Sequence, residues 1–293
     1  MSSASIVRLL LLSAIWGASF LFMRVSAPFF SPTDLIFWRV GLGAVFLFCV
    51  SLFLAKRLRL REYWKHYLIL GLFNAAIPFS LFAFAAKTAS ASLLSILNST
   101  APIWAALIGH VLFKAETKAQ AWMGMVIGLI GVGFLIGVES LALPGGGLLA
   151  ILAALGATFC YGVGTHYARR AKPNDAFSNA HGNMWGAAAL LAPFFLFSDP
   201  ASPMLPATVI VSILLLGVLC SGVAFLLYFR LVEDIGATST LTVTFLIPVF
   251  GVFWGVVFLG ESVGWHSVFG TALIFLGLTL VTGLGNRFFR VRR

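Results

Sequence analysis

Long apolar runs dominate this sequence and restrict what it can fold into. Ten runs have roughly the 20 residues that a helix needs to cross the hydrocarbon core of a bilayer. They occupy residues 5–27, 33–55, 67–87, 91–113, 121–138, 147–168, 176–197, 207–229, 235–259 and 264–284. The chain is 60% hydrophobic and 10% charged, whereas soluble domains are about 25% charged. We therefore predict an all-α polytopic membrane protein with ten transmembrane helices.

Cations gather in alternate connections between the apolar runs. If the chain starts on the inner side and crosses ten times, sixteen of its 19 lysines and arginines lie on that side. Only Arg24, Arg39 and Lys87 lie on the opposite side. Short loops rich in cations stay cytoplasmic, so both termini are predicted to be cytoplasmic, including a basic tail at residues 286–293. The net charge of +10 thus reports topology, and no nucleic-acid partner is expected.

The two halves of the chain, residues 1–140 and 147–285, look like copies of each other. A shift of 146 residues superposes Asn98 on Thr244, Pro102 on Pro248, and Gly124, Gly131 and Gly137 on Gly270, Gly277 and Gly283. Each half holds five spans, an odd number, so the second half must be inverted in the membrane relative to the first. Inverted repeats of this kind are typical of transporters, whose substrate site lies near the midplane between the halves.

The most unusual apolar run contains Ala91–Pro102, with the sequence ASLLSILNSTAP. Ser92, Ser95 and Ser99 share one face of a helix because they are spaced by three and four residues. Such a face serves either tight helix packing or the wall of a polar cavity. The amide of Asn98 is costly to leave unpaired in hydrocarbon and favours the cavity.

The second copy of this stretch, Ala237–Pro248, carries threonines in place of the serines. Their alternate spacing distributes them around the helix, and Thr242 is the candidate for contact with a solute. We therefore expect an asymmetric cavity in which Ser95, Asn98 and Ser99 of the first copy supply more of the polar recognition.

Aromatic residues occupy equivalent mid-span positions in the two halves. Trp16 and Tyr161 are each followed by glycine and are related by a shift of 145 residues. They either pack ordinarily within the bundle or sandwich an apolar side chain by offset stacking. In the third span, Asn74, Pro78 and Phe79 repeat the combination of a polar residue, a helix breaker and an aromatic wall.

The proline positions and one arginine are candidates for conformational roles. Pro78, Pro102 and Pro248 interrupt apolar spans, so the fourth and ninth spans are predicted to bend as gates. Arg39 lies several residues inside the second span. Its side chain either snorkels to the outer headgroups, which is the simpler interpretation, or forms an outer-gate salt bridge or a transient contact with a substrate carboxylate.

Several motifs resemble those of the EamA family in the drug/metabolite transporter superfamily. They are Trp16-Gly17-Ala18-Ser19-Phe20, Phe37-Trp38-Arg39, the hydroxyl-rich Ala91–Pro102, Phe113–Glu116 and Leu259-Gly260-Glu261. Within the family the sequence most resembles YddG-type aromatic amino-acid exporters. The resemblance implies a basket-like fold in a bacterial inner membrane, with a central cavity lined by spans 1, 3, 4, 6, 8 and 9 and with spans 5 and 10 at the periphery.

The sequence thus predicts an exporter of small neutral metabolites, foremost aromatic or large apolar amino acids, that works by alternating access. No fixed charge is expected at mid-membrane, which disfavours the lipophilic cations and nucleotide sugars carried by related families. Exporters of other metabolites or drugs, a passive channel and an integral-membrane transferase are the alternatives. No enzymatic activity, cofactor or metal is expected, since no histidine has a second ligand at metal-binding spacing. The expected partners are a small solute and the lipid bilayer, with the chain a monomer or weak homodimer.

Overall fold

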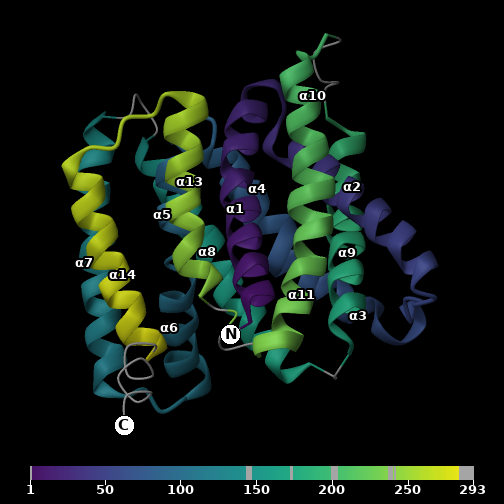
Figure 1. Ribbon diagram of the computed structural model, residues 1–293, viewed down its shortest axis with the longest axis horizontal. Helices are drawn as coiled ribbons and strands as arrows, with labels where there is room; N and C mark the ends of the chain where they lie inside the picture. The colour runs from purple at the N-terminus through teal and green to yellow at the C-terminus, as the bar shows by residue number, and fades with distance from the viewer. Residues whose placement is uncertain are drawn as a thin grey trace.

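The computed structural model of the chain describes residues 2–142, 147–171, 174–198, 204–236, 240 and 242–283, with the backbone alone for residues 136–142. The secondary structure of the described residues is helical throughout (Figure 1). The predicted tail at 286–293 and part of the second hydroxyl-rich stretch lie outside the described residues.

Helices of the first half run up and down in succession, and three of the predicted spans are divided into shorter elements. The first half comprises α1 (Ser3–Ser26), η1 (Ala27–Phe29), α2 (Pro32–Phe53), α3 (Leu60–Gly71), η2 (Leu72–Ala76), α4 (Ile77–Ala85), α5 (Ala91–Asn98), α6 (Ala101–Phe113) and α7 (Ala119–Ala142). The second half comprises α8 (Gly147–Arg170), α9 (Ala176–Leu196), α10 (Ala207–Leu214), η3 (Leu215–Val223), α11 (Ala224–Ile235), α13 (Val243–Leu259) and α14 (Trp265–Thr282).

Seven helical segments among the described residues are long and apolar enough to cross a membrane. Two shorter apolar helices, Ala119–Leu135 and Val243–Leu259, coincide with the predicted fifth and ninth spans. Helix α9 coincides with the predicted seventh span. The prediction of an all-helical, multi-pass membrane protein is confirmed, while the count of ten crossings stays a prediction.

The packing partners of the first half recur in the second half. Helix α1 packs on α13, and its counterpart α8 packs on α5 and α6. Helix α2 packs on η3, and its counterpart α9 packs on η2 and α3. The pairs α2–α9 and α7–α14 each join a helix to its own counterpart, and α5 packs on α13, so the fourth span also contacts the ninth, as a two-fold relation between the halves requires.

Helices α7 and α14 form a pair at one side of the molecule (Figure 1). Their contact is made by glycines, because a Cβ built on Gly124 would lie 2.6 Å from the Gly277 carbonyl oxygen. A Cβ on Gly131 would lie 2.9 Å from the Gly270 carbonyl oxygen. Glycines of the repeat therefore lie at this contact, with Gly124 opposite Gly277 and Gly131 opposite Gly270, and allow the two backbones to approach closely.

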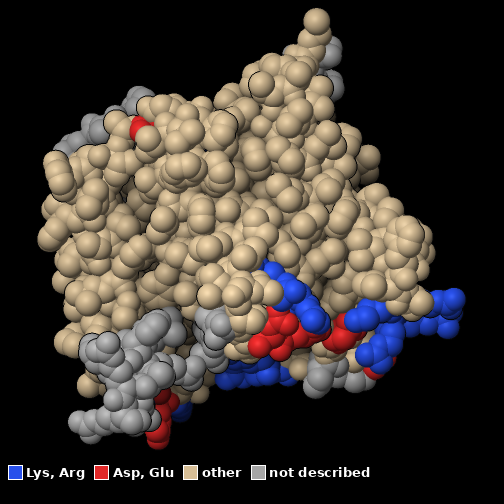
Figure 2. Space-filling model, in the orientation of Figure 1, with Lys and Arg blue, Asp and Glu red and all other residues tan. Residues whose placement is uncertain are grey.

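The lysines and arginines visible in Figure 2 gather at one edge of the molecule. In Figure 2 most of the visible lysines and arginines lie along the lower edge, where α1 begins and α14 ends in Figure 1. This is the distribution expected of a cytoplasmic face.

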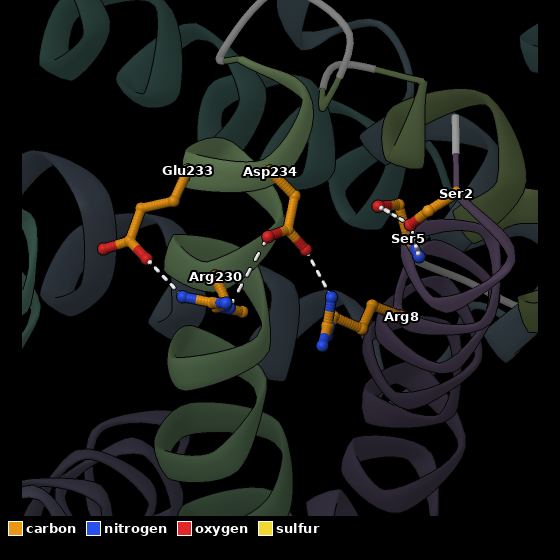
Figure 3. Close-up of polar contacts among 6 residues, drawn as sticks. All are labelled: Ser2, Ser5, Arg8, Arg230, Glu233 and Asp234. Atoms are coloured by element: carbon orange, nitrogen blue, oxygen red, sulfur yellow. Dashed lines mark hydrogen bonds and ion pairs between the residues drawn. The ribbon is translucent and has the colours of Figure 1, made fainter.

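A small charged network ties the two halves together at this face (Figure 3). Arg8 of α1 contacts Asp234 of α11. Arg230 lies 3.1 Å from a carboxylate oxygen of Glu233 and 3.5 Å from one of Asp234. Asp234 is the more buried of the two carboxylates and links both arginines, so its charge contributes more to the packing of α1 on α11.

Replacing Asp234 by Asn is expected to lower stability by about 1 kcal/mol, the upper range for partly exposed pairs. In a thermal unfolding measurement in detergent this corresponds to a midpoint about 2–4 °C lower. The matched variant Glu233→Gln removes only an exposed partner of Arg230 and should leave the midpoint unchanged. Equal effects of the two variants would show that the contact between Arg8 and Asp234 contributes nothing.

Candidate functional site

A cavity of about 1860 Å³ extends into the centre of the helix bundle. Its mouth is formed by the connection between α6 and α7 and by the ends of α8 and α14, with Glu116, Lys118 and Arg169 at the rim. Its deep end is formed by Met23, Arg39 and neighbouring residues on α1, α2 and α4. The cavity therefore opens at the cation-rich face and is closed at the opposite face.

The walls include more helices than the resemblance implied. The predicted spans 1, 3, 4, 6, 8 and 9 all contribute residues to the lining. Helix α2 adds Arg39, α9 adds Asn183, and the last residues of α14 reach the mouth. The peripheral place implied for the tenth span thus holds for its packing on α7 but not for its end.

Two groups of aromatic rings line the cavity. In one group, Trp16 lies 5.7 Å from Tyr228 and 6.2 Å from Phe225, measured between ring centroids. In the other, Tyr161 lies 6.5 Å from Phe79 and 6.4 Å from Phe82. The indole N–H of Trp16 donates to the Cys220 carbonyl at 3.2 Å, which fixes the ring in the wall.

The two aromatic groups correspond through the sequence repeat. A shift of 146 residues superposes Phe79 on Phe225 and Phe82 on Tyr228. Together with Trp16 and Tyr161, each half therefore supplies one ring from its first span and two from its third. The sequence prediction included Trp16, Phe79 and Tyr161 but missed Phe225 and Tyr228, which the same shift would have found.

Each of three cavity-lining polar residues is followed by a proline four positions later. Asn74 precedes Pro78, Asn98 precedes Pro102, and Thr244 precedes Pro248. Because proline has no N–H, the carbonyl of the residue four positions earlier loses its α-helical donor.

The backbone at two of these positions departs from the α-helix. Asn74 lies within the π-helical segment η2, and two turn residues, Ser99 and Thr100, separate Asn98 from α6. Each site thus combines a neutral side chain that lines the cavity with a carbonyl that lacks its α-helical donor. The equivalent segment η3 in the second half is also π-helical. The sequence contains no signal that distinguishes a π-helix from an α-helix.

The hydroxyl-rich stretch itself is positioned differently from the prediction. Ser95 and Ser99 are fully buried, do not line the cavity, and donate to the carbonyls of Ser92 and Ile96. A Cβ on Gly251 of α13 would collide with Ser95, so this serine face serves close packing of α5 on α13. The packing interpretation therefore describes these serines in the structure, and their contact with a solute stays a prediction.

The polar groups that do reach the cavity come from both halves. Asn98 lines the cavity, whereas Thr242 directly precedes α13 and Thr244, two residues further on, lines the cavity. The sequence prediction also missed Asn183 of α9, whose side-chain oxygen is buried without a hydrogen-bond partner among the described residues. Asn98 and Thr244 occupy equivalent positions in the two copies, while the asymmetry expected between the copies stays a prediction, because part of the second copy lies outside the described residues.

Arg39 is the most unusual residue of the site. It is 4% exposed, and its guanidinium carbon lies 3.8 Å from the ring centroid of Phe79. Its Nε donates to the Ser221 hydroxyl at 3.1 Å, and Nη1 lies 3.6 Å from the Met23 sulfur. Among the described residues, no carboxylate forms an ion pair with it.

Two expectations are corrected by this geometry. Snorkelling is wrong for Arg39, because Met23, Phe79 and Ser221 hold its side chain inside the bundle. The expectation that the cavity lacks a fixed charge is wrong for the same reason. An arginine at the centre of a membrane helix costs about 2.5–3.5 kcal/mol on insertion scales, so a buried one is a candidate functional group.

Comparisons with known proteins agree with this architecture. The model of the EamA-like transporter family matches twice, at residues 4–137 and 148–283. The chain is 27% identical to the uncharacterized transporter YoaV of Bacillus subtilis, covering 92% of this chain and 93% of the relative. It is 24% identical to the uncharacterized transporter YvbV of Bacillus subtilis, with coverages of 91% and 87%.

Two further comparisons extend over nearly the whole chain. An uncharacterized transporter of Archaeoglobus fulgidus is 25% identical, with coverages of 96% and 98%. A crystal structure with 19% sequence identity superposes with a TM-score of 0.68 over 98% of this chain and 99% of the other. At this identity the superposition shows a shared fold.

Proposed function

Because this chain belongs to the EamA-like transporter family and is a membrane transporter, we propose that it exports small metabolites with an aromatic or large apolar side chain, foremost amino acids. We place it in a bacterial inner membrane with both termini cytoplasmic. The observation that carries the proposal is the aromatic-walled cavity, open at the cation-rich face. A solute could therefore enter from the cytoplasmic side, as export requires.

The chemistry of the walls supports this substrate class. Each offset or edge contact between aromatic rings contributes about 0.5–1.5 kcal/mol beyond area burial, and each half of the chain supplies three rings. The amides of Asn74 and Asn98 and the hydroxyl of Thr244 add neutral hydrogen-bonding groups. A polar backbone with a large apolar side chain fits both kinds of wall.

Alternating access follows from the relation between the halves. The cavity reaches only one face, and the packing partners of the first half recur in the second half, which supports this mechanism. Rocking of one half on the other would close the present mouth and open the opposite face. Pro78, Pro102 and Pro248 are the positions at which we propose that the lining helices bend, and Arg39 lies at the end that must open.

Flux into liposomes that contain the purified protein tests the substrate class. Labelled phenylalanine should be carried faster than methionine, and methionine faster than threonine. The flux should be saturable and accelerated by unlabelled substrate on the other side, which a passive channel does not show. No stimulation by a pH gradient is expected, because the only carboxylate that lines the described cavity, Glu116, lies at its mouth. Absence of flux for all three amino acids would overturn the proposed class.

A variant of the aromatic wall separates recognition from folding. Tyr161→Ala is expected to reduce the transport efficiency for phenylalanine about tenfold, through lost stacking and area, with a smaller effect on threonine. The matched control Phe159→Ala lies on the same helix and removes a ring that is 42% exposed and does not line the cavity. If both variants transport phenylalanine equally well, Tyr161 does not contact the solute.

A further inference from the structure

We propose that Arg39 binds the carboxylate of the transported solute at the closed end of the cavity, and that the solute's amino group is dispensable. The substrates would then be aromatic carboxylates in general, with amino acids as one subset. This inference rests on the proposed function, since it names the chemistry of the solute in the same cavity.

The donors of Arg39 are incompletely used by the protein. A guanidinium carries five N–H donors in a planar fork. One is directed to the Ser221 hydroxyl and one approaches the thioether of Met23, which is a weak acceptor. The described residues provide no hydrogen-bond partner for the remaining N–H groups, and Arg39 lines the cavity. This is the arrangement that a carboxylate can complete with two parallel hydrogen bonds.

Two other arginines of the chain have the strong acceptors that are typical of a structural role. Arg24 donates to the carbonyl of Ala86 at 2.6 Å, beyond the end of α4, and Arg8 pairs with Asp234. Both positive charges are met by a strong acceptor. Arg39 is more buried than either, yet its partners are a hydroxyl, a sulfur and a ring. Buried charges are normally paired, and the partner of Arg39 is missing from the described protein.

The opposite charge of an amino acid has no equivalent site. The cavity offers its ammonium group the neutral side-chain oxygens of Asn74, Asn98 and Thr244. The single lining carboxylate among the described residues, Glu116, lies at the mouth. The carboxylate is therefore met by a full opposite charge, while the ammonium group meets only neutral acceptors. Removal of the amino group should cost far less than removal of the carboxylate.

The position of Arg39 also explains why an aromatic side chain would accompany the carboxylate. Its guanidinium stacks on Phe79, and Phe79 is in edge contact with Tyr161 at 6.5 Å. A carboxylate bound to Arg39 thus brings the rest of the solute against these rings. The positive charge of Arg39 and the aromatic rings of Phe79 and Tyr161 thus lie next to each other in the cavity wall.

Competition with labelled phenylalanine flux tests the inference with three compounds that share one ring. Unlabelled phenylalanine and 3-phenylpropionate, which lacks the amino group, should compete with inhibition constants within about tenfold of each other. Phenethylamine, which lacks the carboxylate, should be at least about 100-fold weaker, the size expected for loss of a charge-assisted bidentate pair. Competition is used because both analogues cross bilayers passively. Phenethylamine competing as well as phenylalanine would overturn the carboxylate site but leave amino-acid export standing.

Variants of Arg39 test whether this residue causes the difference between the three compounds. Arg39→Gln should weaken competition by phenylalanine and by 3-phenylpropionate about 100-fold, and Arg39→Lys should have an intermediate effect. The control Arg24→Gln removes an arginine that does not line the cavity and should leave both constants unchanged. If Arg39→Gln does not yield folded protein by size exclusion, the comparison of the three compounds with the unaltered protein still decides.

Direct binding separates this inference from the proposed function. Trp16 lies in the cavity wall, so quenching of tryptophan fluorescence reports binding without transport. Binding of 3-phenylpropionate without binding of phenylalanine would support the carboxylate site and overturn amino-acid export. Binding of neither compound would overturn both.

Discussion

Replacing Glu261 by alanine is expected to open the closed end of the cavity. One carboxylate oxygen of Glu261 accepts the Ala91 amide at 2.7 Å, and the other accepts the Ser92 amide at 2.9 Å and the Ser92 hydroxyl at 2.6 Å. Glu261 follows α13, so these bonds fasten the end of α13 to the start of α5. Both helix ends lie at the face opposite the mouth.

The carboxylate is well placed for this role because a helix start leaves four amides without intrahelical partners. Glu261 accepts the first two amides of α5, and the hydroxyl and the carbonyl of Ser90 accept those of Leu93 and Leu94. The negative charge also interacts favourably with the helix dipole. Charge-assisted bonds contribute about 1.5–3 kcal/mol each and are not additive, so we expect a loss of about 2–4 kcal/mol from the closed state.

The rate at which a cysteine deep in the cavity is labelled from the outer side measures how far the closed end opens. A cysteine at Met23, in a background without Cys49, Cys160 and Cys220, should react with a membrane-impermeant thiol reagent from the outer side at least tenfold faster when Glu261→Ala is added. That factor is a lower bound, since about 1.4 kcal/mol already corresponds to tenfold.

Two further variants set the scale of that measurement. Glu261→Gln keeps one acceptor and should give an intermediate rate. Glu233→Ala removes an exposed carboxylate at the other face and should change nothing. Equal rates for Glu261→Ala and Glu233→Ala would mean that Glu261 does not hold the outer face closed.

The all-helical, multi-pass character of the chain could be predicted from the sequence because the bilayer restricts it so strongly. Runs of about 20 apolar residues have to be helices, and the repeat of prolines and glycines indicated the relation between the halves before any contact was known. The glycines of the repeat do lie at the contact between α7 and α14, although Gly124 lies opposite Gly277 and Gly131 opposite Gly270. The pairing of α7 with α14 was not predicted, although only glycine permits so close an approach of two backbones.

The orientation of polar side chains was less predictable. A serine can satisfy its hydroxyl on its own helix, so the face formed by Ser95 and Ser99 fits packing and cavity alike. Asn98 cannot do this as readily, and it does line the cavity. The environment of Arg39 was not predictable because Met23, Phe79 and Ser221 come from three different spans. Only the folded chain shows that this arginine is buried and lacks an anionic partner among the described residues.

Replacing Gly277 by valine is expected to prevent α14 from packing on α7. A Cβ at this position would lie 2.5 Å from the Gly124 carbonyl oxygen and 2.6 Å from the Gly128 nitrogen. Both are backbone atoms and cannot rotate away, so the helices would have to separate. Overpacking costs about 1–3 kcal/mol even where side chains can adjust, and here we expect at least the upper value, with most of the folded protein lost.

The matched control lies on the partner helix. A Cβ on Gly133 of α7 meets no atom within 4 Å, so Gly133→Val adds the same side chain without a collision. The measurement is the yield of monodisperse protein after size exclusion, together with its thermal midpoint, and Gly277→Ala should fall between the two valine variants. Because Gly277 does not line the cavity, any folded Gly277→Ala protein should bind solute with unchanged affinity. Equal yields for Gly277→Val and Gly133→Val would mean that close packing of α14 on α7 is not needed for the fold.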